Sequence, residues 1–385
     1  MGILDTVAIA GIGNTEFSRD SGRSETQLAA ECIKSALDDA GLAPADVDGM
    51  VTFTIDNTED VDLIRNLGIP GLRYASRIPH GGAGSGGSVV HAAGAIAAGL
   101  ADVVVVWRAM NERSEYRFGS ANAAKPAPGG GAVNMQWAVP WGAATPACWQ
   151  SMVSHRYMTE FGVTNRDLAE IAVLHRKHSL NNPNAFGFQK ELTVEDHQNS
   201  RWIIEPVLRL LDCCQESDGG QAFVVTSLER ARDLRQKPAR ITAGAQWVPY
   251  PTDAITNFYF DDFTEMATTQ GMARQLYEQS GIGPADIQVA MLYDHFSPIL
   301  LQHLEAFGFC AKGEAMDFIR DGNCALDGAL PTNTHGGLMS EAYIHGLNSL
   351  AEAVRQIRGT AINQIEGVEH AAFSSGMTGL ILGKD

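Results

Sequence analysis

One short pattern occurs in both halves of the sequence. Residues 37–51 read LDDAGLAPADVDGMV and residues 277–292 read YEQSGIGPADIQVAML, an offset of 277 − 37 = 240 positions. Each stretch predicts a helix, a Pro-Ala-Asp turn that Pro starts and Asp caps, and then a strand. Two further similarities keep this order: a Gly-Gly pair before a helix, and a Gly-rich stretch at 217–227 that returns at 373–383. The repetition predicts two βαβ-type units with a site at their interface.

Strands and helices alternate along the chain with one interruption. We expect, in order, a strand within 6–17, a helix over 24–42, a strand within 43–54, a helix over 89–100 and an apolar strand over 101–107. Residues 72–80 make a poor strand. A loop or cap region is inserted at about 109–215, and strands and a short helix return at 218–249. We therefore predict an N-terminal half, 1–250, and a C-terminal half, 251–385.

The composition excludes several classes of partner. The 385 residues carry a formal net charge of −17, whereas binding duplex nucleic acid requires an excess of Lys and Arg. We find neither a signal peptide nor a transmembrane run. MGILDT matches a myristoylation pattern, but Thr6–Gly13 reads as a buried strand, which disfavours a lipid anchor. We expect a cytoplasmic protein that binds neither nucleic acid nor membrane.

The cysteines and two histidines give no metal signal. The six cysteines form no Cys-x-x-Cys pair, so we expect neither a disulfide framework nor a zinc site in this chain. Cys213 and Cys214 are adjacent in an apolar run, which favours a place in the core. His175 and His178 stand at i and i+3 on a predicted helix without neighbouring carboxylates, so we expect them at the surface.

The stretch HGGAGSGGSVVHAAGAIAAG (80–99) is typical of backbone that approaches a ligand closely. Its segment GAGSGG (82–87) is formally Gly-x-Gly-x-x-Gly, but no acidic residue follows at a strand end about 20 residues later, as a dinucleotide site requires. The same segment approaches the Gly-x-Ser-x-Gly pattern of hydrolases, without a strand that leads into Ser85. We disfavour both interpretations and keep the hydrolase as a testable alternative, because a Ser85 nucleophile would react with a fluorophosphonate probe.

Two other stretches gather tyrosines and histidines at predicted sheet ends. MLYDHFSP (291–298) closes an apolar strand, and TNTHGGLMSEAYIHG (332–346) enters a helix through His-Gly-Gly. A lone Tyr is normally a half-buried amphipathic residue, but this clustering favours a functional site. The candidate catalytic residues are Tyr293, Asp294, His295, Tyr343 and His345.

These motifs resemble those of the thiolase superfamily over essentially the whole chain. The resemblance is carried by the duplicated halves, AGSG (83–86), YDHF (293–296), NTHGGLMSEAYIHG (333–346) and FSSGMTGLILG (373–383). It implies an α/β thiolase fold with two duplicated βαβαβ-type halves, a mixed five-stranded sheet in each, and an inserted loop or cap region.

The chain departs from catalytic thiolases at every reactive position. Ala83 stands where the nucleophilic Cys is expected, Tyr293 replaces the Asn or His before the acid, and Tyr343 replaces the His of Gly-His-Pro. Ser374 or Ser375 falls near the second Cys. Because an acyl-enzyme needs a thiolate, we expect neither Claisen condensation nor thiolysis.

The paired tyrosines are similar to those of lipid-transfer-protein-like thiolase homologues that cleave steroid side chains as aldolases. That resemblance implies retro-aldol cleavage of a β-hydroxyacyl-CoA with a steroid or bile-acid side chain, giving a ketone and a short acyl-CoA. It also implies a homodimer core and a partner protein built of an OB fold and a zinc ribbon. CoA would enter as part of the substrate, and zinc would lie only in the partner subunit.

The retro-aldol hypothesis assigns a role to each candidate residue. Tyr343 would lie near the substrate hydroxyl and Tyr293 near the enolate or the hydroxyl, with the two roles exchangeable and His295 and His345 as proton relays. The Ala83 N–H and an N–H of the 375–379 loop would stabilise the thioester enolate. Residues expected to line the substrate or its oxyanion are Ala83, Gly84, His335, Gly336, Ser375, Gly376 and Met377. The alternative is a carrier of acyl-CoA or lipid that performs no chemistry.

Overall fold

A computed structural model describes residues 3–53, 58–115, 117–120, 138–186, 190–250, 260–262 and 264–385. The boundary predicted between 250 and 251 touches residue 251, which lies outside the described residues, as does 121–137 of the predicted cap region. The strands are β1 (Val7–Asn14), β2 (Gly49–Phe53), β3 (Tyr74–Ile78), β4 (Val103–Asn111), β5 (Trp202–Ile204), β6 (Leu208–Arg209), β7 (Asp218–Ser227), β8 (Ala239–Gln246), β9 (Val289–Leu292), β10 (His370–Ser374) and β11 (Thr378–Gly383).

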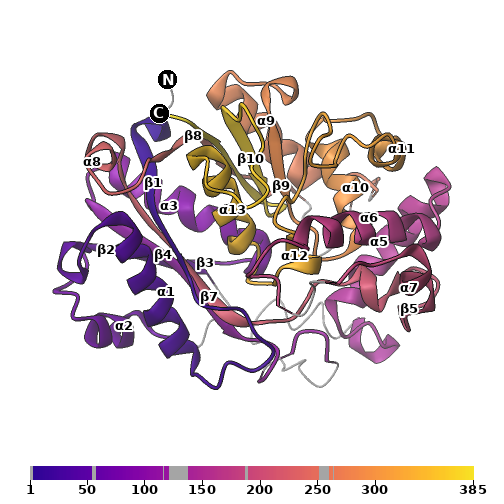
Figure 1. The fold of residues 1–385 in the computed structure, drawn as a ribbon, viewed down its shortest axis with the longest axis horizontal. Helices are drawn as coiled ribbons and strands as arrows, with labels where there is room; N and C mark the ends of the chain where they lie inside the picture. Colours follow the sequence, from indigo (N-terminus) through magenta and orange to yellow (C-terminus); the bar gives the residue numbers. More distant parts are fainter. Residues whose placement is uncertain are drawn as a thin grey trace.

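The helices are α1 (Glu25–Ala40), α2 (Asp60–Leu67), α3 (Ser85–Ala97), α5 (Pro146–Phe161), α6 (Asn165–Ser179), α7 (Val194–Asn199), α8 (Leu228–Arg232), α9 (Ala267–Ser280), α10 (Ser297–Ala306), α11 (Ala315–Arg320), α12 (Gly337–Ser340) and α13 (Leu347–Arg358). Short 3₁₀ turns include η2 (Pro44–Asp46), η3 (Gly81–Gly84) and η7 (Pro284–Asp286). Figure 1 shows how these elements are arranged around the sheet.

The repeated Pro-Ala-Asp turns fold alike. In η2 the Asp46 carboxylate accepts the Ala43 N–H at 2.8 Å, and in η7 the Asp286 carboxylate accepts the Gly283 N–H at 2.8 Å. Each turn leads directly into a strand, β2 or β9. The prediction that Pro starts the turn and Asp caps it is confirmed in both halves.

The sheet differs from the predicted pair of five-stranded sheets. The strands form one mixed nine-stranded sheet in the order β3-β2-β4-β7-β1-β8-β11-β10-β9. Strand β8, which lies in the predicted N-terminal half, joins the halves: it pairs with β1 through Arg240 and Ala239, opposite Ala8 and Ile9, and far more extensively with β11 of the C-terminal half. The stretch 72–80, predicted to be a poor strand, contains β3, which pairs in parallel with β2 at the sheet edge.

Two central helices tie the halves together. Helix α3 contacts β2, β4 and β7 and also β8 and β11, which lie beyond β1 in the strand order. Helix α13 contacts β9 and β10 as well as β1 and β7. Their apolar side chains share one buried cluster with strands of both halves. Helix α1 covers the outer face of the first half, and α9 and α10 cover that of the second. The inserted region supplies α5 and α6, which pack on the second half.

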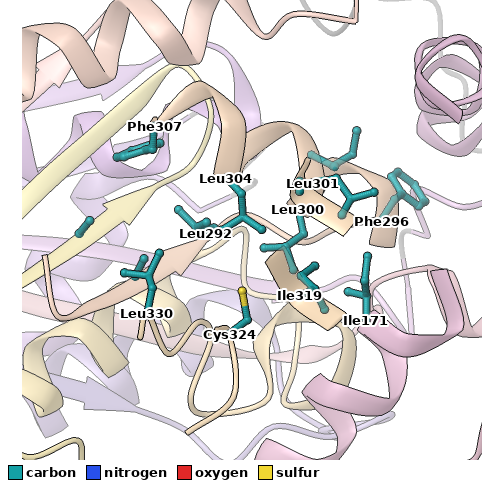
Figure 2. Close-up of a cluster of buried hydrophobic side chains, with 14 of the residues drawn as sticks. Ile171, Leu292, Phe296, Leu300, Leu301, Leu304, Phe307, Ile319, Cys324 and Leu330 are labelled. Carbon is teal, nitrogen blue, oxygen red and sulfur yellow. The ribbon is translucent and has the colours of Figure 1, made fainter. Parts of the chain in front are cut away.

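The segment that carries Tyr293 is anchored in the core at both ends. Leu292, the last residue of β9, and Phe296, just before α10, belong to one buried hydrophobic cluster with Leu300 and Leu304 of α10 (Figure 2). Ile171 of α6 joins the same cluster. This packing holds the three residues between Leu292 and Phe296 in place.

The helix predicted after His-Gly-Gly is interrupted. Helix α12 ends at Ser340, and α13 begins only at Leu347. His345 and Gly346 have φ of 50° and 84°, which break the helical path, and the Tyr343 N–H donates to Ser217 Oγ at 3.1 Å. Tyr343 and His345 therefore stand in a break between two helices, where their side chains leave the helical surface.

Candidate active site

Tyr293 and Tyr343 meet at their hydroxyl groups. Tyr293 follows β9, Tyr343 lies between α12 and α13, and their phenol oxygens are 2.7 Å apart. The side chains are buried, and Leu338 packs against both of them. The structure thus brings together two residues that lie 50 positions apart in the sequence, as the predicted cluster required.

The Gly-rich loop lies directly against this pair. A Cβ atom on Gly82 would stand 2.0 Å from the Tyr293 hydroxyl and 3.2 Å from the His345 ring. A Cβ on Gly346 would stand 3.0 Å from the Tyr293 ring and 3.4 Å from Ser85 Oγ. Only glycine leaves room at these two positions. The loop at 81–85 is therefore one wall of the tyrosine site.

Burial determines the charge state of the aromatic residues. It raises the pKa of the Tyr293 phenol and places that of Tyr343 well above its ordinary value. It also lowers the pKa of His295 to about 4 and holds that of His345 well below its ordinary range. All four side chains are therefore neutral at neutral pH, because a buried charge without a close partner is costly.

The two candidate histidines flank the tyrosines. The His295 ring centroid lies 4.8 Å from that of Tyr293, and the His345 centroid lies 5.1 Å from that of Tyr343. No hydrogen bond between either imidazole and a phenol is present among the described residues, and both Nδ1 atoms are buried without a partner. The histidines thus neighbour the pair without being bonded to it.

Asp294 faces away from the hydroxyl pair. Its Oδ1 accepts the Leu338 N–H at 2.9 Å, and its Oδ2 lies 2.8 Å from His175 Nδ1. Burial raises the pKa of Asp294, but the His175 partner and the Leu338 N–H outweigh it and leave the pKa below its ordinary value. The carboxylate joins β9, α6 and α12. The expectation that His175 and His178 lie at the surface is wrong, because both are fully buried under this part of the site.

His335 and Gly336 belong to the support of the site. His335 Nε2 lies 3.2 Å from Ser349 Oγ and 3.7 Å from Glu341 Oε2, and burial lowers its pKa to about 4. Gly336 has φ of 108° and turns the chain into α12 against Ser179. The structure does not bring the His335 ring to the tyrosine hydroxyls.

The last Gly-rich loop is bonded to the first. The Ala83 carbonyl accepts hydrogen bonds from Ser375 Oγ at 3.0 Å and from Thr378 Oγ1 at 3.1 Å. Gly84 is buried beside it, Gly376 has φ of 106°, and the Met377 carbonyl accepts the Trp247 N–H at 2.9 Å. The two loops form one small-residue wall that has no thiol at position 83 or 375.

Several residues of the site escaped sequence reasoning. Cys214, expected in the core, packs against the tyrosine cluster, and burial raises its pKa well above the ordinary value, so its thiol is neutral. Glu112 lies close enough to raise the pKa of both phenols and is itself 3% exposed. Buried polar atoms around the pair that lack a hydrogen-bond partner within the described ranges are Ser85 Oγ, Glu112 Oε2, His295 Nδ1 and His345 Nδ1.

Neither a cluster of metal-ligating side chains nor a membrane-spanning helix is found among the described residues. Within those ranges, no three His, Cys, Asp or Glu side chains are grouped in a way that could hold a metal ion. None of the described helices is both long and apolar enough to cross a bilayer.

The two halves, joined across central helices with a site between their Gly-rich loops, define the thiolase class. The model for the thiolase N-terminal domain matches residues 7–244, and the model for the thiolase C-terminal domain-like family matches 253–383. The chain therefore belongs to the thiolase family, and the predicted resemblance and fold class are confirmed. Human mitochondrial 3-ketoacyl-CoA thiolase, at 16% identity and a TM-score of 0.66, shares the fold.

The chain is similar to lyases over nearly its whole length. A steroid side-chain-cleaving aldolase of Thermomonospora curvata is 51% identical over 383 residues, which cover 98% of each chain. The 17-hydroxy-3-oxo-4-pregnene-20-carboxyl-CoA lyase of Mycobacterium tuberculosis is 50% identical over 382 residues, again 98% of each. A solved structure of an Ltp2-ChsH2(DUF35) aldolase has a TM-score of 0.94 at 50% identity, and the match covers 99% of this chain and 98% of that one. By name, these homologues are carbon–carbon lyases.

Proposed function

We propose that this chain is a carbon–carbon lyase that cleaves a β-hydroxyacyl-CoA by a retro-aldol reaction, giving a ketone and a short acyl-CoA. The observation that carries the proposal is the buried contact of 2.7 Å between the Tyr293 and Tyr343 hydroxyls, beside a loop whose position 83 holds Ala. A retro-aldol needs proton carriers and no covalent nucleophile, whereas thiolysis needs a thiolate.

The proton accounting of the reaction suits a neutral pair of phenols. Cleavage moves one proton from the substrate β-hydroxyl to its α-carbon, while the electron pair of the broken C–C bond passes into the thioester enolate. One phenol accepts the hydroxyl proton as it passes its own proton to the other phenol, which protonates the α-carbon. The pair begins and ends neutral, so the raised pKa values of Tyr293 and Tyr343 do not oppose the reaction.

The transient charge of the enolate would be met by the small-residue wall. In our proposal the donors are the Ala83 N–H, an N–H of the 375–379 loop and the Ser85 hydroxyl, whose oxygen is buried without a partner. A well-placed donor of this kind contributes about 3 kcal/mol to transition-state stabilisation. His295 and His345, neutral and adjacent to the phenols, would bind the ketone or the hydroxyl of the substrate.

The substrate class follows from the relatives at about half identity. Both curated relatives act, by name, on steroid side chains or on a pregnene carboxyl-CoA. We infer that this chain takes a steroid side-chain CoA thioester. The similar solved complex contains a ChsH2(DUF35) component, which supports our expectation of a partner subunit with an OB fold and a zinc ribbon, on a homodimer core.

The experiment is a pair of single substitutions assayed for ketone and short acyl-CoA. Tyr293→Phe and Tyr343→Phe should each lower kcat by more than about tenfold, with unchanged melting temperature, because each breaks the proton relay. Tyr277→Phe removes the hydroxyl of a half-buried tyrosine, which donates to the Phe307 carbonyl outside the site, and should retain activity. Full activity of both site variants would refute the relay.

A carrier role remains the second candidate, and the product distinguishes it. A carrier would bind the steroid CoA thioester and release it unchanged, even with the partner subunit present. A lyase would release a ketone and a short acyl-CoA, detectable by mass spectrometry. A serine hydrolase would release free CoA and label with a fluorophosphonate at Ser85.

A further inference from the structure

Glu112 stands at the end of a strand that leads into the tyrosine site. Strand β4 pairs with β7 up to Asn111 opposite Asp218, so Glu112 comes next to Ser217, the residue before β7. Ser217 Oγ accepts the backbone N–H of Tyr343 at 3.1 Å, and the backbone of Glu216 forms an isolated parallel β-bridge with that of Tyr343. Glu112 thus belongs to the first half of the chain, and its carboxyl group is near enough to both phenols of the second half to affect their pKa values.

The surroundings of Glu112 are unlike those of Asp294. Asp294 accepts the Leu338 N–H and has His175 Nδ1 2.8 Å from its Oδ2, whereas Oε2 of Glu112 is fully buried without a hydrogen-bond partner among the described residues. A buried polar oxygen without a partner destabilises the fold unless another group satisfies it. Such an atom beside a candidate active site needs an explanation, and a role in the reaction supplies one.

The charges that face Glu112 come from several segments. Glu216 and Asp218, before and at the start of β7, repel its carboxylate, while Arg108 of β4 and Arg117 attract it. Arg117 already pairs with Glu216 at 2.5 Å. Cys214, Tyr293 and Tyr343 are the neutral titratable groups nearby. Burial, aided by Glu216, raises the pKa of Glu112 well above its ordinary value and so favours the protonated, neutral carboxyl group.

We propose that Glu112 is a third proton-bearing residue of this site, and that its carboxylic acid donates a hydrogen bond toward the Tyr293–Tyr343 pair during cleavage. The inference rests on the proposed function. The donated hydrogen bond stabilises the phenol oxygen that is momentarily electron-rich while protons pass between the tyrosines. Glu112 keeps its own proton throughout, so the relay stays balanced. It acts through the pair and is a positioning residue.

The same arrangement gives the site an upper pH limit. When Glu112 ionises, it loses the donor and places a negative charge beside the forming enolate, which opposes cleavage. We expect the kcat/KM profile of the wild type to fall on the alkaline side as this group loses its proton. Glu112→Gln keeps an N–H donor and cannot ionise.

The test compares Glu112→Gln with Glu112→Ala across the pH range, on the full chain with its partner. Glu112→Gln should keep kcat at neutral pH within about threefold and move the alkaline limb to higher pH, whereas Glu112→Ala should lose about 100-fold in kcat with little change in KM. Glu305→Gln is the matched control: Glu305 lies on α10, outside the site, and the pKa of its carboxyl is also raised by burial, but this carboxyl accepts the Gly313 N–H. This control should leave the limb in place.

Stability supplies a second readout that needs no substrate. The folded chain holds the Glu112 proton more tightly than the unfolded chain, so this residue makes stability decline as pH rises above the ordinary carboxyl range. Glu112→Gln should therefore melt progressively higher than the wild type from pH 5 to pH 9. An unmoved alkaline limb would overturn the proposal about Glu112 while the Tyr→Phe results still decide the lyase function. If the melting temperatures of Glu112→Gln and the wild type instead change in parallel with pH, the claim that Glu112 is neutral in the folded chain is wrong.

Discussion

The molecule contains two His-Gly-Gly turns, one in each half, and the helix that follows is continuous after the first turn but interrupted after the second. At the first turn His80 and Gly81 have φ of 83° and 54°, and the chain passes through η3 into the uninterrupted helix α3. At the second turn Gly336 and Gly337 have φ of 108° and 66°, but α12 ends after one turn. The break that follows carries Tyr343 and His345.

The difference shows how a duplicated unit builds an asymmetric site. The first copy keeps small residues and offers backbone at close range, with Gly82 against the Tyr293 hydroxyl. In the second copy the helix is interrupted, and the break carries Tyr343, which meets the Tyr293 hydroxyl, and His345, whose ring lies near Gly82. A single unbroken helix at 337–358 would carry Tyr343 and His345 along its surface instead. The site therefore needs one regular copy and one interrupted copy.

The strongest way to break the first copy is to fill its close approach. Gly82→Ala would place a Cβ where only 2.0 Å separates it from the Tyr293 oxygen, so the phenol must move by an ångström or more. We expect a loss of at least about 100-fold in kcat/KM, since misplacement of that size is this costly. Gly94→Ala, on the open side of α3 with nothing within 4 Å, is the control and should stabilise the fold by ~0.5–1 kcal/mol. Equal activities of the two variants would contradict the close approach.

The two histidines of these turns should differ in how they make stability depend on pH. Burial lowers the pKa of His335 to about 4 and lowers that of the half-buried His80 as well. Since both pKa values lie below those in the unfolded chain, stability is present above about pH 6.5 and is lost as pH falls through the folded values. His335→Gln should reduce the loss of melting temperature between pH 7 and pH 5 more than His80→Gln. The reverse order would show that the second turn is open to water.

The smallest effect is expected for Ala83→Cys, the substitution that puts back the nucleophile of catalytic thiolases. Ala83→Cys restores a thiol to the nucleophile position of the first loop. Tyr293 still replaces the Asn or His of catalytic thiolases, and Tyr343 still replaces the His of their Gly-His-Pro motif. We expect no thiolysis of a 3-ketoacyl-CoA above background, and lyase activity within about threefold of the wild type. Robust thiolase turnover in this variant would contradict the account, because it would mean that the tyrosines are compatible with acyl transfer.

The features that could be predicted from the sequence are mainly those that depend on residues close together in the chain. The Pro-Ala-Asp turns are local, and both were predicted correctly, as were the family and the gathering of Tyr293 and Tyr343. The break after Ser340 was missed because a positive φ at His345 cannot be read from a non-glycine residue. The pairing of Ala8 and Ile9 with β8 was missed because it depends on tertiary packing.

The residues that escaped prediction have contacts distant in sequence. His175 looked like a surface residue on a polar helix, and only the folded chain brings Asp294 to it from more than 100 positions away. Glu112 follows a strand without any motif, and its importance lies in what surrounds it. Cys214 was read as core, and the structure places it where core and site meet. The one signal that was available is the acidic side chain directly after the apolar strand at 103–111.

The shared helix layer has a consequence for how this molecule can change over generations. Helix α3 of one half and α13 of the other lie in a single interior with strands from both. Neither half could therefore bury the apolar side chains of this central layer by itself. A gene encoding one half alone would specify a domain with an open hydrophobic face. A substitution on either central helix must therefore pack well against strands of both halves. The two halves have become free to diverge in chemistry at their loops, but they are bound to evolve together in shape.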